Sequence, residues 1–239
     1  MLNSKYGIYY NGHHSSEFGL ICLQDKQVGM PAKNKILVDL PFSNNKLDLS
    51  SIYGSQVYDE RTYIQVFNLK VPNWDKEKLY RLWTKVVNWL MSTSTKSPLF
   101  DDLMKRYYYL AEVQEAPEFD EMLNRGTLTV KWQCYPFRIS ALNEGNDIWN
   151  AFDFDFDVAQ RVKYTIDGSV QISLINNGAS ALIPTVIADA DMQISYNGQT
   201  IAIKAGTIKD VAITLQTGKT DLIVTGKGTI EFVFNKELI

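Results

Sequence analysis

The chain has 239 residues and a formal net charge of −3, and 45% of its residues are hydrophobic while 21% are charged. These values are ordinary for globular proteins, so they exclude a disordered chain and a coiled coil, and the length suits two domains. Neither half is strongly basic, because 16 basic residues face 15 acidic ones through Pro136 and 8 face 12 beyond it, so we expect no direct nucleic-acid binding.

The start of the chain predicts a soluble protein that opens with a β-hairpin. Residues 1–11 contain neither a basic leader nor an apolar stretch, and no run approaches the ~18 apolar residues of a membrane span. We therefore expect a protein made in a cytoplasm, without a membrane partner. Gly7–Tyr10 is followed by Asn11-Gly12, the dipeptide that best tolerates positive φ at both central positions of a tight turn.

Three further strands are expected before residue 70. Phe18–Leu23 is a short apolar run, and Lys35–Leu40 alternates until Pro41 interrupts it. Tyr58–Leu69 is the clearest strand of the first half. Its alternation places four side chains on one face, namely Tyr63, Gln65, Phe67 and Leu69.

A helix follows, because the apolar period changes from two to between three and four. Asn73 or Asp75 can cap its free amides. The pattern predicts an amphipathic helix of about five turns. Its polar face is basic and could lie on a membrane, but a single helix between strands typically covers a sheet, which we predict here. The apolar positions are Leu79, Leu82, Trp83, Val86, Val87 and Leu90.

Strands resume after the helix. Tyr107–Val113 and Gly126–Gln133 are predicted strands, and the second places Leu128, Val130 and Trp132 on one face. We expect Pro117–Arg125 between them to be an acidic loop. Strands on both sides of one helix indicate an α+β first domain.

The second half contains only short strands and turn signals, at a spacing near ten residues that is typical of a β-sandwich. Met192–Tyr196 should pair with Gln199–Ile203 across Asn197-Gly198. Further strands are predicted at Ile213–Leu215, Leu222–Thr225 and Thr229–Phe234. Other expected turns lie at Asp167-Gly168, Asn176-Asn177-Gly178, Gly206, Thr217-Gly218 and Gly226-Lys227-Gly228.

The change of character near residues 133–143 divides the chain. We predict a mainly β fold class, with an N-terminal β-sandwich-like α+β domain of residues 1–137 that contains one helix. Residues 138–239 form the second predicted domain, a C-terminal β-sandwich.

Residues that could bind metal or react are few. Cys22 and Cys134 have no C-x-x-C partner, so we interpret them as buried small hydrophobic residues. His13 and His14 are the only histidines, and adjacent strand positions point to opposite faces, which does not suit a joint metal site. We predict no metal and no cofactor.

The Phe-Asp repeat, residues 152–157, alternates three aromatic rings with three carboxylates. Such oxygen ligands suggest calcium, but a twelve-residue calcium loop starting at Asp153 requires Gly and Glu where the chain has Val158 and Tyr164. We expect a linker strand with its rings packed down and its acids in water. The alternative is an ionic contact with a neighbouring subunit.

No catalytic set can be assigned. Candidate acid pairs for glycoside cleavage are Asp101-Asp102, Asp189 with Asp191, and the loop Glu115–Glu121, and none is preferred. The chain has no G-x-S-x-G and no phosphate-binding glycine loop before a helix. We therefore predict that the protein is not an enzyme.

Several short segments occur in a characteristic order along the chain. In the first half they are Tyr10-Asn11-Gly12, Phe18-Gly19-Leu20, the strand Tyr63–Leu69, a helix ending in Trp89-Leu90, and Gly126–Phe137. In the second half they are Ile175-Asn176-Asn177-Gly178, Pro184 and Gly226-Lys227-Gly228-Thr229-Ile230. In this order the segments resemble the distal tail (Dit) proteins of long-tailed, non-contractile phages that infect Gram-positive bacteria. Tyr53-Gly54-Ser55 departs from the family, where we expect a glycine-rich turn with a charged residue.

The resemblance implies that residues 1–137 assemble as a ring and that residues 138–239 form a galectin-like β-sandwich projecting outward. It implies a homo-hexameric hub at the tail tip of the virion, assembled in the host cytoplasm. Such a hub joins the tail tube protein to the tail-associated fibre or lysin protein, and in many phages to receptor-binding proteins. A chain of this length resembles the short form of the family, and the inter-subunit contact residues are unknown.

Two other functions stay open from the sequence. A carbohydrate-binding adhesion module that recognises host cell-wall saccharide would use aromatic residues such as Trp149, Tyr164 and Tyr196, although fold likeness alone does not transfer binding. A cell-wall hydrolase would require an acid pair that the sequence does not identify.

Overall fold

The computed structural model describes residues 6–51, 56–123 and 125–239. The described part is mainly β with a single α-helix, so the predicted fold class is confirmed. It contains two compact units. The domain boundary at residues 137/138, and the separate roles expected of the two domains, stay predictions. Unit 1 comprises Met1–Asn34, Tyr58–Ile139 and Ile239, and unit 2 comprises Lys35–Val57 and Ser140–Leu238.

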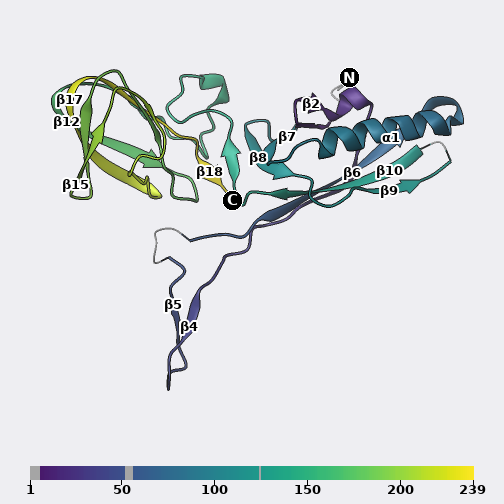
Figure 1. Cartoon of the computed structure of the whole chain (residues 1–239), viewed down its shortest axis with the longest axis horizontal. Coiled ribbons are helices and arrows are strands. Elements are labelled where there is room, and N and C mark those ends of the chain that lie inside the picture. The colour runs from purple at the N-terminus through teal and green to yellow at the C-terminus, as the bar shows by residue number, and fades with distance from the viewer. Residues whose placement is uncertain (1–5, 52–55, 124) are drawn as a thin grey trace. The chain divides into compact units, whose positions relative to one another are not determined.

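Unit 1 is built on one antiparallel sheet, with the strand order β2-β1-β7-β8-β10-β6-β3 and β9 paired to β10 (Figure 1). The hairpin predicted at the start is confirmed, since Tyr10 pairs with His13 across Asn11-Gly12. The strands are β1 (Ile8–Tyr10), β2 (His13–His14), β3 (Ile21–Val28), β6 (Arg61–Lys70), β7 (Ser97–Asp101), β8 (Tyr107–Glu112), β9 (Glu118–Glu121), β10 (Arg125–Cys134) and β11 (Arg138–Ser140).

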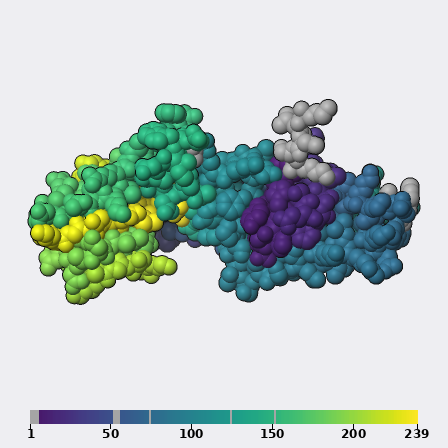
Figure 2. Space-filling model, turned by 90° about the horizontal axis from the view of Figure 1, so that it is seen from above, coloured from purple at the N-terminus to yellow at the C-terminus, as the bar shows by residue number. Residues whose placement is uncertain are grey.

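The core of unit 1 lies between this sheet and the helix. The alternation of β6 is as predicted, because every second residue from Arg61 to Leu69 is buried. Trp132 of β10 is fully buried, with its ring centroid 5.8 Å from that of Tyr63. Figure 2 shows the N-terminal segment, in purple, packed against the blue and teal residues of the same unit. Rings and aliphatic side chains thus form one continuous core.

Helix α1 (Lys76–Met91) covers the sheet, as expected for a single helix between strands (Figure 1). It begins after Asp75, whose carboxylate accepts the Lys78 amide at 3.0 Å. Its end is fixed to β1, because the indole of Trp89 donates to the Tyr10 carbonyl at 2.8 Å. Two 3₁₀ turns, η1 (Ser15–Phe18) and η2 (Pro72–Trp74), precede β3 and α1.

The acidic loop expected at residues 117–125 is wrong, because it contains strand β9. Phe119 of β9 packs against the helix, with its ring centroid 5.7 Å from that of Trp83. A Cβ at Gly126 of the paired strand would lie 2.2 Å from Phe119 Cε2, so the glycine leaves room for the ring. One aromatic residue facing a glycine keeps an otherwise acidic segment in the sheet.

Unit 2 contains a six-stranded antiparallel sheet in the order β15-β14-β17-β13-β16, with β12 paired to β17. The predicted hairpin is confirmed, since Tyr196 pairs with Gln199 across Asn197-Gly198. The six strands are β12 (Lys163–Asn176), β13 (Thr185–Ala188), β14 (Met192–Tyr196), β15 (Gln199–Ile203), β16 (Gly206–Ile208) and β17 (Gly218–Val233). A further short strand, β18 (Glu237–Leu238), is not part of this sheet. The unit also contains the hairpin of β4 (Leu37–Asp39) and β5 (Lys46–Asp48).

Two predicted turns of unit 2 are wrong. Asp167-Gly168 lies inside β12 and Gly226-Lys227-Gly228 inside β17, and Gly168 pairs with Gly226. The two facing glycines have φ of 89° and 152°, values that glycine adopts without strain, and the strands stay paired through them without a shift of register. The two strands predicted at residues 222–234 are therefore one. Ile213–Leu215 is not a strand, although Leu215 forms a bridge with Leu182.

Tyr53-Gly54-Ser55, the departure from the family pattern, lies outside the described residues. Among the residues that are described, no helix is long and apolar enough to cross a membrane.

Candidate functional site

The two cysteines are placed for packing. Cys134 is fully buried and Cys22 is half-buried, and both are free. Burial raises the pKa of Cys22 to about 11 and that of Cys134 to about 12. Because the thiolate is the reactive form, both thiols stay protonated and unreactive at neutral pH.

One histidine, His14, takes part in a cluster that sequence reasoning missed, whereas His13 pairs with Glu17. His14 Nδ1 lies 2.6 Å from Ser16 Oγ, and its Nε2 lies 3.2 Å from Asp102 Oδ2, which gives a Ser-His-Asp order. The Ser16 amide, however, donates to the same His14 nitrogen at 3.3 Å, and Asp102 accepts the Gly7 amide at 2.9 Å. The Ser16 amide, the nearest group that could stabilise an oxyanion, is thus already engaged in a hydrogen bond. The cluster is therefore structural: it caps η1 and holds the residue that precedes β1.

The acid pairs named from the sequence are engaged in structural contacts. Asp101 is buried and accepts from Lys26 and from the Tyr63 hydroxyl, the latter at 2.9 Å. Asp191 pairs with Lys204 at 2.6 Å, and Asp189 accepts the Thr229 amide at 2.7 Å. Glu115 pairs with Lys131 and Glu121 with Lys76. Within the described ranges, no group of three or more His, Cys, Asp or Glu is suited to hold a metal ion.

A cavity of about 300 Å³ lies in unit 1, between the ends of several strands and the β7–β8 connection. We call it the basic cavity. Its walls include the apolar side chains of Val28, Met30, Leu103 and Met104. Three cations, Lys26, Arg61 and Arg138, also line it. They are accompanied by the carboxylate of Asp101 and by Ile239, whose main-chain oxygen accepts a hydrogen bond from Arg138.

The cations of the basic cavity differ in their partners. Lys26 pairs with Asp101, but Arg61, only 3% exposed, has no carboxylate within ion-pair distance in the described parts of the chain. Its guanidinium donates to the carbonyls of Gly29 at 2.7 Å and Pro136 at 3.2 Å. Burial lowers the pKa of Arg61, and Arg138 adds to this effect by charge repulsion. Arg61 is therefore a buried positive charge without a carboxylate partner, and its guanidinium lies 5.2 Å from the centroid of the Tyr109 ring.

The Phe-Asp repeat forms a turn, so the linker strand predicted there is wrong. The amides of Phe156 and Asp157 both donate to the Asp153 carbonyl, at 3.2 and 2.7 Å. A turn cannot sort rings and acids onto opposite faces, and Phe154 is 88% exposed with the carboxylate of Asp155 beside it in the chain. We call these two residues the acidic-aromatic tip.

A buried lysine fixes this turn to the rest of unit 2. Lys236 is 1% exposed, donates to the Phe156 carbonyl at 2.7 Å and pairs with Asp157. Glu144 lies 3.7 Å from the same ammonium, and burial raises the pKa of its carboxyl group. Asn177 adds a further hydrogen bond to the Phe156 carbonyl. These contacts fix the base of the tip, at Phe156 and Asp157.

The hairpin of β4 and β5, which we call the hairpin arm (residues 35–50), has no core of its own. Every residue from 35 to 48 is exposed. Ion pairs of Lys35 with Asp48 and of Lys46 with Asp39 join the strands, at 2.7 and 3.1 Å. Two strands alone are marginally stable in water. The large apolar side chains that it exposes are Ile36, Leu37, Val38, Leu40, Phe42 and Leu47.

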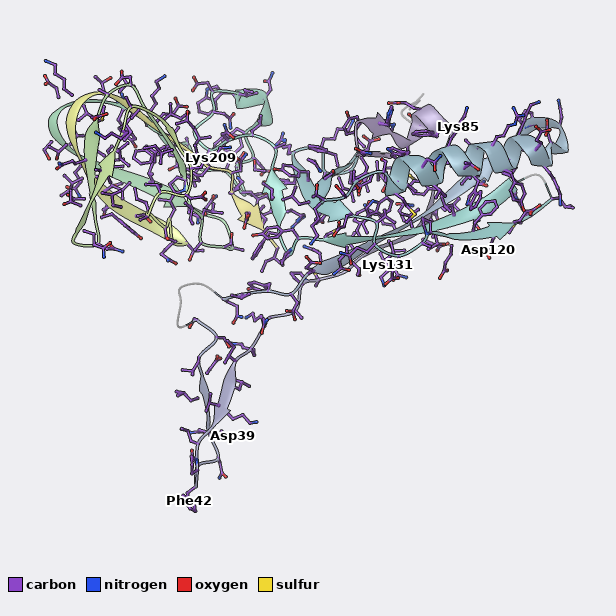
Figure 3. The ribbon with its side chains drawn as sticks, in the orientation of Figure 1. Asp39, Phe42, Lys85, Asp120, Lys131 and Lys209 are labelled. Carbon is purple, nitrogen blue, oxygen red and sulfur yellow. The ribbon has the colours of Figure 1, made fainter. Side chains whose placement is uncertain are left out.

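Phe42 lies at the tip of the hairpin arm (Figure 3). It follows Pro41 in a turn closed by the Ser43 amide and the Leu40 carbonyl, and its φ is 60°. A bulky residue rarely adopts this left-handed conformation, which glycine or asparagine would occupy without strain. The chain thus presents an exposed aromatic ring at a backbone cost, which is typical of an interaction site.

The aromatic residues considered for saccharide stacking differ in accessibility. Trp149 is 71% exposed, and its ring centroid lies 5.6 Å from that of Phe152. The hydroxyl groups of Tyr164 and Tyr196 donate to main-chain carbonyls, those of Arg161 and Thr214, at 2.6 and 2.7 Å. Of the three, Trp149 presents the most open ring.

The fold is similar to that of the SPP1 Dit protein, gp 19.1, whose crystal structure has been described as a paradigm of the hub adsorption apparatus in phages that infect Gram-positive bacteria. The TM-score is 0.63 at 12% sequence identity, and the match covers 98% of this chain and 99% of that chain. No family model and no curated protein matches the sequence. The resemblance to distal tail proteins is therefore confirmed at the level of the fold.

Proposed function

We propose that this chain is a structural hub protein of a phage tail tip, which assembles from roughly six copies into a ring. In this proposal it joins the tail tube protein to the tail-associated fibre or lysin protein and to receptor-binding proteins, and it needs no catalysis and no cofactor. The shared fold with a hub protein over nearly the whole of both chains supports this function. The domain proposal follows, with residues 1–137 forming the ring and residues 138–239 a galectin-like domain that projects from it.

The single observation that carries the proposal is the hairpin arm. Its apolar side chains are exposed in a single copy of the chain. Because exposed apolar surface of this kind usually marks an interface, we expect another protein surface to cover it. Strand edges can pair with a neighbouring chain, and head-to-tail contacts between identical copies close into a ring when the rotation allows it. We therefore assign the arm to contacts between neighbouring copies of the ring.

The test is the mass of the assembly and its appearance in negative-stain electron microscopy. We expect a ring of roughly six chains for the wild type, in isolation or with its tail partners. Leu47→Glu, which places a charge on the arm, should prevent the ring, whereas Asn44→Ala on the same hairpin should leave it intact. A wild-type protein that stays monomeric at high concentration, also with its tail partners, would refute the proposal.

A second candidate function, saccharide binding, is favoured by Trp149 alone. An open indole can stack on a pyranose face, as aromatic residues do in carbohydrate-binding proteins. Titration with host cell-wall saccharide should then show saturable binding that Trp149→Ala abolishes and Tyr164→Phe retains. Absence of saturation with the wild-type ring would remove this candidate.

A further inference from the structure

We propose that the acidic-aromatic tip of one copy docks in the basic cavity of the next copy, with Phe154 among the apolar side chains and Asp155 facing Arg61 and Arg138. The inference rests on the proposed ring and adds to it a contact that unit 2 of one copy makes with unit 1 of the next. It couples two features of the chain that lie in different units, so each copy offers one of each to its two neighbours.

The lining of the cavity suits a carboxylate together with a neighbouring apolar side chain. Arg61 is buried with neutral hydrogen-bond partners. The terminal nitrogens of Arg138 donate to Met104 Sδ and to the Ile239 main-chain oxygen, whereas its buried Nε has no hydrogen-bond partner among the described residues. A buried charge without a counter-ion is costly, and an incoming carboxylate would offset that cost. Met30 and Met104 line the same space, and methionine adapts its shape and contacts aromatic rings favourably. The volume of about 300 Å³ is at the lower end for ligand pockets, which suits one aromatic side chain with its neighbour.

The tip has the complementary chemistry. No lysine or arginine occurs from residue 140 to residue 160, whereas this stretch contains five acids. Two of the five, Glu144 and Asp157, face Lys236, and the described residues provide no cation for Asp155. Phe154 is exposed although its ring centroid lies 5.1 Å from that of Phe152. An exposed ring next to an unpaired carboxylate is what the basic cavity would bind.

The tip is also pre-organised, which lowers the entropy cost of docking. Lys236 and Asn177 hold the Phe156 carbonyl, and the Asp155 amide donates to the Asp153 side chain at 3.0 Å. Binding then orders few additional torsions. A contact between two different surfaces of identical copies is head-to-tail, the type that closes into a ring when the rotation between copies allows it. The second copy is therefore the occupant that the charges and the symmetry both favour.

Photocrosslinking tests the contact directly. The full chain with p-benzoylphenylalanine in place of Phe154 is mixed with ¹⁵N-labelled wild type, assembled, irradiated and analysed by mass spectrometry. We expect crosslinks between unlabelled and labelled chains at Met30, Leu103 or Met104. A ring with the mass of six chains but with crosslinks elsewhere, only within one chain, or absent would overturn the docking while leaving the hub function standing. A protein that forms no ring would overturn both.

Reversing the charges of the proposed pair provides the second test. A partial folding defect in one variant does not spoil it, because the readout is whether the double variant regains association. Asp155→Arg should weaken self-association by about tenfold or more, since it places a cation against Arg138. Adding Arg138→Glu in the same chain should restore association to within about threefold of wild type. Asp147→Arg, in the same acidic stretch but outside the tip, is the matched control and should change association by less than about twofold. Equal effects of the two arginine variants, or no rescue, would contradict the docking.

Discussion

A substitution of Phe42 should have two opposite effects, because the backbone conformation of this residue destabilises the hairpin arm whereas its side chain is proposed to favour assembly. Phe42→Gly should stabilise the hairpin arm by about 1 kcal/mol, since glycine adopts a φ of 60° without a steric penalty. The same change removes the exposed phenyl group and should weaken the proposed assembly of six chains. Slower hydrogen exchange of the Ser43 amide would report the first effect, and analytical ultracentrifugation the second. Phe42→Asn should behave alike, and unchanged assembly of both variants would show that the side chain has no role.

Lys236 is the second residue at which a single substitution should change stability strongly, in this case the stability of unit 2. Lys236→Met leaves Asp157 and the buried Glu144 without their cation, so we expect unit 2 to lose about 3–5 kcal/mol of unfolding free energy. Denaturant unfolding followed by fluorescence measures this loss. Lys209→Met, at an exposed position of the same unit, should cost less than about 0.5 kcal/mol. Similar losses for the two variants would show that the buried lysine is not an anchor.

Glu144 should make the stability of unit 2 depend on pH. Burial raises the pKa of its carboxyl group, and Lys236 only partly opposes this. Between the ordinary value of 4.5 and the raised value, the folded chain therefore holds the proton and the unfolded chain does not. The contribution of this group is complete below the ordinary value and is lost as the pH rises through the window. Glu144→Gln should flatten the decline in unfolding free energy above about pH 4.5, and an unchanged slope would contradict it.

At the scale of elements, helix α1 depends on its cap. Asp75→Ala removes the acceptor for the Lys78 amide and should cost about 1 kcal/mol, whereas Asp75→Asn can still accept that bond and should cost much less. Circular dichroism during urea unfolding provides the measurement. Equal losses from the two substitutions would indicate that the carboxylate acts through charge instead.

Elements with a strong period were predictable from the sequence, and those fixed by partners were not. The alternation of β6 and the three- to four-residue spacing of α1 each reflect a face buried against one core, so the pattern is visible along the chain. Gly168 and Gly226 predicted turns because glycine favours them, but they face each other in paired strands. The Phe-Asp repeat alternates like a strand, yet bonds to the Asp153 carbonyl and to Lys236 fold it into a turn.

The basic cavity was invisible to sequence reasoning for the same reason. Arg61 occurs at an ordinary strand position, and only the fold brings it near Lys26 and Arg138, which are remote in the chain. A basic residue at an inward-facing position of β6, in phase with Tyr63, was the one signal that could have found it. A charged residue on the buried face of a strand usually indicates a structural or binding role, because burying a charge without a partner costs free energy.

At the scale of the whole molecule, two separate cores predict two separable responses to mutation. Leu128 lies in the core of unit 1 and Ile194 in that of unit 2, and both are fully buried. Leu128→Ala and Ile194→Ala should each lower the stability of their own unit by about 2–5 kcal/mol, because each leaves a cavity that its neighbours fill only partly. Hydrogen exchange resolved by peptide should show faster exchange in β6 and β10 for the first variant, and in β14 and β17 for the second. If either substitution accelerates exchange equally in both units, they unfold as one cooperative body and the predicted division at residue 137 is not a domain boundary.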